Sequence, residues 1–160
     1  MSYTANQIAD WFISKVNTEA GDTISPLKLQ KLIYYAQAWH LASFGESLFE
    51  GRIEARRHGP VAPSVYQRFR DLCMDCQIMP SEIKLDIPEL KPEQEQLLSE
   101  VLETYGEHSA SYLENLTHSE TPWIEARAGC PPYEKCNNEI RHEVMMVFYR
   151  SMNGKEASGA

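Results

Sequence analysis

The chain has 160 residues, of which 42% are hydrophobic and 24% charged, and its net charge is −8. This balance is typical of a soluble globular domain, and the acidic charge argues against nucleic-acid binding, which needs basic side chains to neutralise phosphates. No apolar run approaches the roughly eighteen residues of a membrane span, and no signal peptide is evident, so we expect a cytoplasmic protein without membrane contact.

Two helices are predicted in the first 45 residues. The first covers residues 4–18 and starts with a capping box. The second covers residues 26–44, because Ser25 suits the N-cap and Gly45 can end the helix in a left-handed conformation. Its apolar side chains recur at the spacing of one helix face: Leu29, Leu32, Ile33, Ala36 and Trp39.

The middle of the chain is predicted to contain short extended segments and one more helix. Glycines and prolines over residues 45–63 disfavour a long helix, so extended segments are predicted near 48–49 and 52–55. A third helix is predicted to start at Pro63 and to end before Pro80.

A short alternation over residues 83–87 resembles a strand and precedes a helical C-terminal part. Helices are predicted over residues 92–106, 109–117, 121–128 and 138–151. The last of them is predicted to bury Ile140, Val144, Val147 and Phe148. The predicted fold class is mainly α, a compact domain of about six helices with a small extended or β element near residues 48–62. We expect a single domain over 1–152 and a flexible tail over 153–160.

The four cysteines are expected to be thiols or metal ligands, because disulfides are rare in a reducing cytoplasm. Cys73 and Cys76 have the spacing of zinc ligands, and Cys130 and Cys136 would supply a second pair. The favoured alternative is core thiols, because the first pair falls on the apolar stripe of the predicted third helix. We therefore predict no cofactor.

Most of the arginines stand between residues 52 and 70, with His58 among them. Such a cluster favours a protein interface, since arginine pairs with carboxylate or phosphate groups in a bidentate manner and often anchors interfaces. The alternative is pairing with local acids, because Glu54 and Asp71 lie alongside. The adjacent Tyr34 and Tyr35 cannot both point directly inward from one helix, so one of them is expected to line a surface groove.

No catalytic motif stands out. The His-Glu-x-x-His, Gly-x-Ser-x-Gly and Gly-rich phosphate-binding patterns do not occur in the sequence. His118 would suit a general base, but no nucleophile accompanies it. We therefore predict that the chain is not an enzyme.

Residues 25–39, Ser-Pro-Leu-Lys-Leu-Gln-Lys-Leu-Ile-Tyr-Tyr-Ala-Gln-Ala-Trp, resemble the signature of the Panacea domain family, the SocA-like antitoxins also described as phage-associated proteins. Further matching segments lie at 45–49, 53–55, 58–63, 65–66 and, more weakly, 116–123. The family tends to carry aromatic residues between Ala55 and Gly59, where this chain has Arg56, Arg57 and His58. That departure concerns the choice of partner and not the fold.

The resemblance implies a bacterial or prophage antitoxin that neutralises a cognate toxin by binding it. It also implies an alternative, an adaptor that delivers the toxin to an ATP-dependent protease. A zinc-binding protein or metalloenzyme is the alternative of another class. The expected contact residues lie on the exposed face of the 26–44 helix and in the 50–65 loop: Lys28, Lys31, Tyr35, Arg56, Arg57, His58 and Tyr66.

Overall fold

The computed structural model describes residues 3–131 and 134–159, with the backbone alone for residues 153–159. Its elements in chain order are β1 (Tyr3–Thr4), α1 (Ala5–Ser14), η1 (Thr18–Ala20), α2 (Pro26–Phe44), β2 (Phe49–Glu50), β3 (Ile53–Arg56), β4 (Gly59–Val61), α3 (Pro63–Arg68), η2 (Pro80–Glu82), α4 (Pro92–Tyr105), α5 (Ala110–His118), α6 (Thr121–Ala126), β5 (Glu139–Ile140) and α7 (His142–Gly159). The mainly α fold class is confirmed. No helix in the described part combines the length and apolar character that crossing a bilayer requires.

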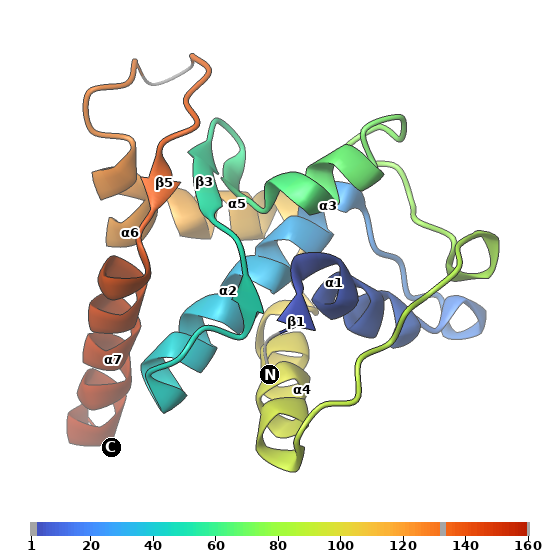
Figure 1. Cartoon of the computed structure of the whole chain (residues 1–160), viewed down its shortest axis with the longest axis horizontal. Helices are drawn as coiled ribbons and strands as arrows, with labels where there is room; N and C mark the ends of the chain where they lie inside the picture. The colour runs from blue at the N-terminus through green and yellow to red at the C-terminus, as the bar shows by residue number, and fades with distance from the viewer. Residues whose placement is uncertain (1–2, 132–133, 160) are drawn as a thin grey trace.

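Helix α2 is the centre of the fold, with α7, α4, α1 and α5 packed around it (Figure 1). It begins and ends as predicted: the Ser25 side chain accepts from the Lys28 amide, and Gly45 caps the other end with φ 72°. Every residue from 29 to 38 is buried. A helix buried over ten consecutive positions is covered on all sides. The prediction that either Tyr34 or Tyr35 lies at the surface is therefore wrong, because both are at most 1% exposed.

Two glutamine side chains of α2 hold the extended segment 48–62 against the helix. Gln30 Nε2 donates to the Ala62 carbonyl (3.2 Å), and Gln30 Oε1 accepts from the Ala62 amide (2.8 Å). Gln37 Nε2 donates to the Phe49 carbonyl (3.0 Å), and its Oε1 accepts from the Leu48 amide (2.6 Å). Each side-chain amide thus satisfies backbone groups that are buried and need a partner.

The strands are short and join distant parts of the chain. β3 lies between β4 and β5 and is antiparallel to both, with Glu54 opposite Val61 and Ile53 opposite Ile140. β1 pairs in parallel with β2. The extended element predicted near 48–62 is confirmed, whereas β1 and β5 were not predicted, because two-residue strands leave no periodic pattern.

The middle of the chain departs from two sequence predictions. α3 ends at Arg68 and not before Pro80, and turns occupy much of the segment from residue 69 to 79. Residues 83–87 form no strand. The backbone there is satisfied by a side chain, since the Asp86 amide donates to Asp10 Oδ2 of α1 (2.8 Å).

The last helix is shifted along the chain. It begins at His142 and extends to Gly159, eight residues past its predicted end, while Ala160 lies outside the described residues. Flexibility over 153–160 stays a prediction. Val147, predicted to be buried, is 66% exposed, and Met145 and Tyr149 are the fully buried residues of this helix. Two apolar faces run along α7, and the periodic pattern could not tell which one meets the core.

We predict that Gln37→Ala lowers the free energy of unfolding by about 2–4 kcal/mol, because it leaves the Leu48 amide and the Phe49 carbonyl buried without partners. Urea titration of both forms measures the difference. Gln96→Ala, on an exposed face of α4, is the control and should change stability by less than about 0.5 kcal/mol. Equal stabilities of the two variants would contradict this role of the Gln37 hydrogen bonds.

Candidate partner-binding surface

Four of the predicted contact residues lie close together at the surface. Arg56, Arg57 and His58 form the end of β3 and the turn into β4, and Tyr66 lies on α3. The Arg56 guanidinium stands 4.8 Å from the centroid of the Tyr66 ring, a cation–π contact. Arg57 is exposed, and Tyr66 is 48% exposed. We call these four residues the hairpin face.

The arginine cluster is largely paired with acids, as the alternative interpretation expected. Arg52 and Arg56 both reach Glu54, at 3.3 and 2.8 Å. Arg68 instead pairs with the buried Asp10 of α1 (2.7 Å), a distant acid that the sequence did not suggest. Half-buried His58 lies 3.3 Å from Glu114 of α5. Pairing therefore fixes the orientation of Arg56, while its side chain stays 30% exposed.

The hairpin face has rigid support beneath it. Trp123 of α6 donates from Nε1 to the Arg56 carbonyl (2.9 Å), and Arg127 donates to the Ala55 carbonyl (3.3 Å). On its other edge, β3 is bonded to β5. A surface held in this way loses little conformational entropy when it binds a partner.

Lys28 does not belong to the hairpin face. It is half-buried, and its Nζ donates to the Gly106 carbonyl at the end of α4. Burial lowers the pKa of Lys28, and the charge of Asp22 opposes that shift. Its place in the structure is a link between α2 and α4.

Lys31 is fully buried, so the expectation that it lies on an exposed helix face is wrong. No hydrogen-bond acceptor among the described residues reaches its Nζ. Burial lowers its pKa to about 7, while the charge of Glu114 favours the protonated form. The side chain runs beneath Gly59: a Cβ added there would stand 2.6 Å from Lys31 Cε and 3.0 Å from Thr117 Oγ1. Gly59 also has φ 114°, which disfavours any other residue.

Tyr35, the third predicted residue on α2, is likewise buried, and its expected surface position is wrong. Its hydroxyl donates to Glu120 Oε1 (2.7 Å), and its ring stacks on Tyr105 with 3.9 Å between centroids. Tyr149 donates to the same Glu120 oxygen (3.0 Å). Burial raises the pKa of Glu120, although both hydrogen bonds favour the charged carboxylate. The sequence did not single out Glu120, because its partners come from separate helices.

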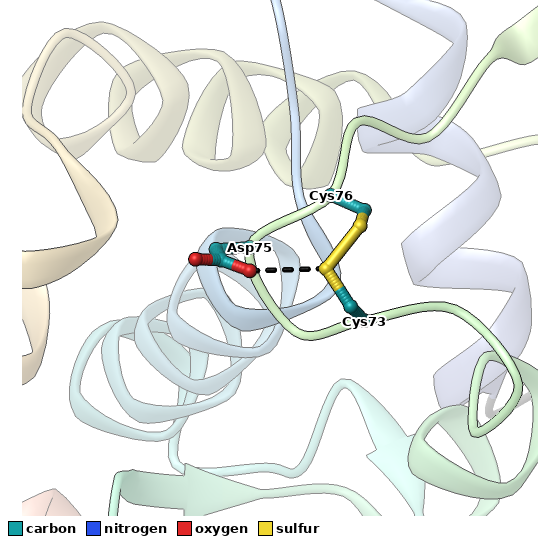
Figure 2. Close-up of side chains that lie close together, drawn as sticks. All are labelled: Cys73, Asp75 and Cys76. Carbon is teal, nitrogen blue, oxygen red and sulfur yellow. Dashed lines mark hydrogen bonds between the residues drawn. A yellow bond between two sulfur atoms is a disulfide. The ribbon is translucent and has the colours of Figure 1, made fainter.

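The cysteines do not assemble the four-residue metal site. The structure joins Cys73 to Cys76 and Cys130 to Cys136 as disulfides, so the expected thiols are wrong. Among the described residues, the one group of three metal-ligating side chains with close ligand atoms is Cys73, Asp75 and Cys76. Figure 2 shows this group in a tight turn, with the Asp75 carboxylate against the Cys73 sulfur. The turn lies beyond α3, so neither cysteine occupies a helix stripe.

A second surface feature lies between α6 and α7. A hollow of about 360 Å³ is lined by Val144, Val147 and Phe148 of α7 and by Thr121 and Glu125 of α6, among others. It is apolar because α7 turns its second apolar face outward there. The sequence carries a signal for this surface, since the apolar residues of α7 recur at helical spacing, but the same spacing also predicts a face buried in the core.

The chain was compared with known proteins. Residues 29–124 match the sequence profile of the family described as "Antitoxin SocA-like, Panacea domain". A curated relative, "Antitoxin SocA" of Caulobacter vibrioides (strain NA1000 / CB15N), is 38% identical over 110 residues, covering 62% of this chain and 58% of the relative. The match thus spans less than two thirds of that relative's length. No solved structure matches this one significantly.

We predict that Gly59→Ala is more destabilising than Gly51→Ala. Both glycines have positive φ, but only Gly59 has neighbours within 4 Å of an added Cβ. Backbone strain alone costs about 1–3 kcal/mol at either position, and a clash with packed Lys31 adds about 1–3 kcal/mol at Gly59. Chemical denaturation of the two variants measures the difference. Similar losses would show that Lys31 can move aside.

Lys31→Met is expected to raise stability at pH 7 by about 1–3 kcal/mol, because a buried amine without a partner costs free energy when charged. The folded pKa of about 7 lies below the ordinary value of 10.5, so the unfolded state binds more protons between these values. The wild type should therefore gain stability relative to the variant as pH rises from 7 to 9.5. Exposed Lys84→Met is the control, and a pH-independent difference for Lys31→Met would contradict this assignment.

Proposed function

We propose that this chain, which belongs to the "Antitoxin SocA-like, Panacea domain" family, is an antitoxin that neutralises a cognate toxin protein by binding it directly. The family match over residues 29–124 carries the proposal, and the similarity to a protein named Antitoxin SocA supports it. We place this activity in the bacterial cytoplasm. Neutralisation by binding requires no catalytic step and no cofactor.

The hairpin face is the proposed contact surface. Arginine and tyrosine are among the residues that most often dominate binding energy at interfaces. Here Arg56 and Arg57 lie on a supported hairpin, and Tyr66 of α3 lies against Arg56. Arg56 carries its charge close to the Tyr66 ring. The expected complement on the toxin is a carboxylate-bearing surface that replaces solvent around the guanidinium groups. Lys31 and Tyr35 act in this proposal as supports inside the scaffold.

Three residues of the hairpin face depart from the family pattern, since Arg56, Arg57 and His58 stand where the family tends to carry aromatic residues. Residues 29–38 of the signature are buried, and so is Gly59 in the matching segment 58–63. A partner contacts surface residues. We therefore expect family members with different partners to differ in sequence at the hairpin face and not in the buried part of the signature.

We predict that Arg57→Glu and Tyr66→Ala each weaken toxin binding at least tenfold, which corresponds to about 1.4 kcal/mol. The toxin candidate is the product of the neighbouring reading frame. Host growth and co-purification are scored after co-expression, and titration calorimetry gives the affinity. Val147→Asp, on the exposed face of α7, is the matched surface control and should leave binding unchanged.

The outcomes separate the alternatives. Growth rescue with a stable complex supports direct neutralisation. Growth rescue in which the toxin disappears, and which fails in a host without the protease, overturns it in favour of the adaptor mechanism. Loss of binding in Val147→Asp but not in the hairpin variants would move the contact surface to the hollow between α6 and α7.

A further inference from the structure

We propose that Cys73 and Cys76 form a reversible dithiol–disulfide pair that exchanges with small thiols of the glutathione type, and that this exchange controls the capping of α2. The pair is separate from the hairpin face, and the proposal does not rest on the antitoxin activity. Three features of the 72–78 turn support it: the access to the sulfurs, the chemistry of the neighbouring carboxylate, and the backbone contacts with α2.

The turn keeps the two cysteines within reach of each other and of solvent. Their Cα atoms are 5.1 Å apart, and the Cys76 amide donates to the Cys73 carbonyl (3.0 Å). Cys73 is exposed and Cys76 is half-buried. The backbone hydrogen bond does not involve the sulfurs, so the turn can hold both cysteines near each other in either redox state. Accessible pairs at this two-residue spacing are typical of sites that undergo thiol–disulfide exchange.

The exchange is a balanced two-electron step. A thiolate of the small thiol attacks the exposed Cys73 sulfur, forms a mixed disulfide with it, and displaces Cys76 as a thiolate that takes up a proton. A second small thiolate then attacks the sulfur of the small thiol in the mixed disulfide and displaces Cys73 as a thiolate, which also takes up a proton. In total, the protein disulfide and two small thiols become the protein dithiol and one small disulfide.

Asp75 affects both directions of this exchange. Its Oδ1 lies 3.0 Å from Cys73 Sγ (Figure 2). In the disulfide form the sulfur has no proton, and the carboxylate repels an approaching thiolate. In the dithiol form the Cys73 thiol donates its proton to the same oxygen, which favours the neutral thiol. The carboxylate is exposed, so salt screens its effect on the attacking anion.

The turn is bonded to the start of α2 on both sides of the helix cap. The Leu27 amide, in the first turn of α2, donates to the Met74 carbonyl (2.9 Å), and the Ile78 amide donates to the Ile24 carbonyl (2.7 Å). The first amides of a helix have no partner within the helix, so Met74 supplies one from outside. Met74 lies between the two cysteines, and their disulfide restricts where its carbonyl can go. Reduction therefore loosens the capping of Leu27, while buried Ile78 keeps the turn attached.

The second disulfide offers an internal comparison. Cys136 is 8% exposed and Cys130 is half-buried, so an external thiol has less access to either of these sulfurs than to exposed Cys73. We expect the two pairs to respond at different rates, with the Cys73–Cys76 pair faster.

The test equilibrates the full chain in buffers of reduced and oxidised glutathione at several ratios. Rapid acid quenching, alkylation and peptide mass spectrometry then give the oxidised fraction of each pair. We expect the Cys73–Cys76 fraction to change progressively with the ratio. A pair that stays in one state from pure reduced to pure oxidised glutathione overturns the proposal.

The coupling to α2 is measured by NMR-detected amide exchange. Reduction, or the double variant Cys73→Ser with Cys76→Ser, should accelerate exchange at the Leu27 amide about tenfold, or about 1.4 kcal/mol of local opening. The matched double variant at Cys130 and Cys136 should leave Leu27 unchanged. Unchanged protection in both the reduced chain and the Cys73/Cys76 variant overturns the coupling.

Asp75→Asn tests the role of the carboxylate without removing either cysteine. Reduction by glutathione thiolate should become several-fold faster in low salt, and the difference from wild type should shrink at about 1 M salt, where the Debye length is about 3 Å. Equal rates at both ionic strengths overturn this part of the proposal.

Discussion

The fold depends on one constraint: α2 is buried on every side over residues 29–38, so each polar group in that stretch needs a partner inside the protein. Gln30 and Gln37 meet this constraint by bonding both to an amide and to a carbonyl of the extended segment. In this way a helix supplies hydrogen bonds that a neighbouring strand would otherwise supply. These contacts fix the chain at β2 and directly after β4, and the β3–β4 hairpin is placed as a result.

Lys31, which packs beneath Gly59, is an exception to this constraint. The lysine occupies the space that the absent Cβ of Gly59 leaves open, and its amine finds no acceptor among the described residues. A buried ionisable group of this kind is costly, yet it lies where the 25–39 segment meets the matching segment 58–63, directly beneath Gly59. The signature thus records how the chain packs around α2, and the surface residues beside it are free to differ.

Local signals in the sequence predicted local structure well. The Ser25 cap, the Gly45 cap and the proline at the start of α4 each act within one helix turn, and the structure has all three. The wrong predictions of burial on α2 and α7 depended on how many neighbouring elements surround each helix. Periodicity shows that a face is apolar, but it does not show whether a helix is covered on one side, as α7 is at Val147, or on all sides, as α2 is at Tyr35. Partners such as Glu120 and Asp10 come from distant segments, so no spacing rule could connect them.

Gln30 and Gln37 lie seven positions apart on α2. Their side chains attach the chain at Ala62 and at Leu48–Phe49, respectively. The intervening residues form a closed loop whose two ends are fixed independently of its tip. Lengthening such a loop costs free energy only logarithmically, about 0.6 kcal/mol for each doubling. Residues inserted at the Arg57–His58 turn would therefore lengthen the loop while its two ends stay attached to α2. This makes the hairpin a suitable place for grafting foreign recognition sequences onto the scaffold.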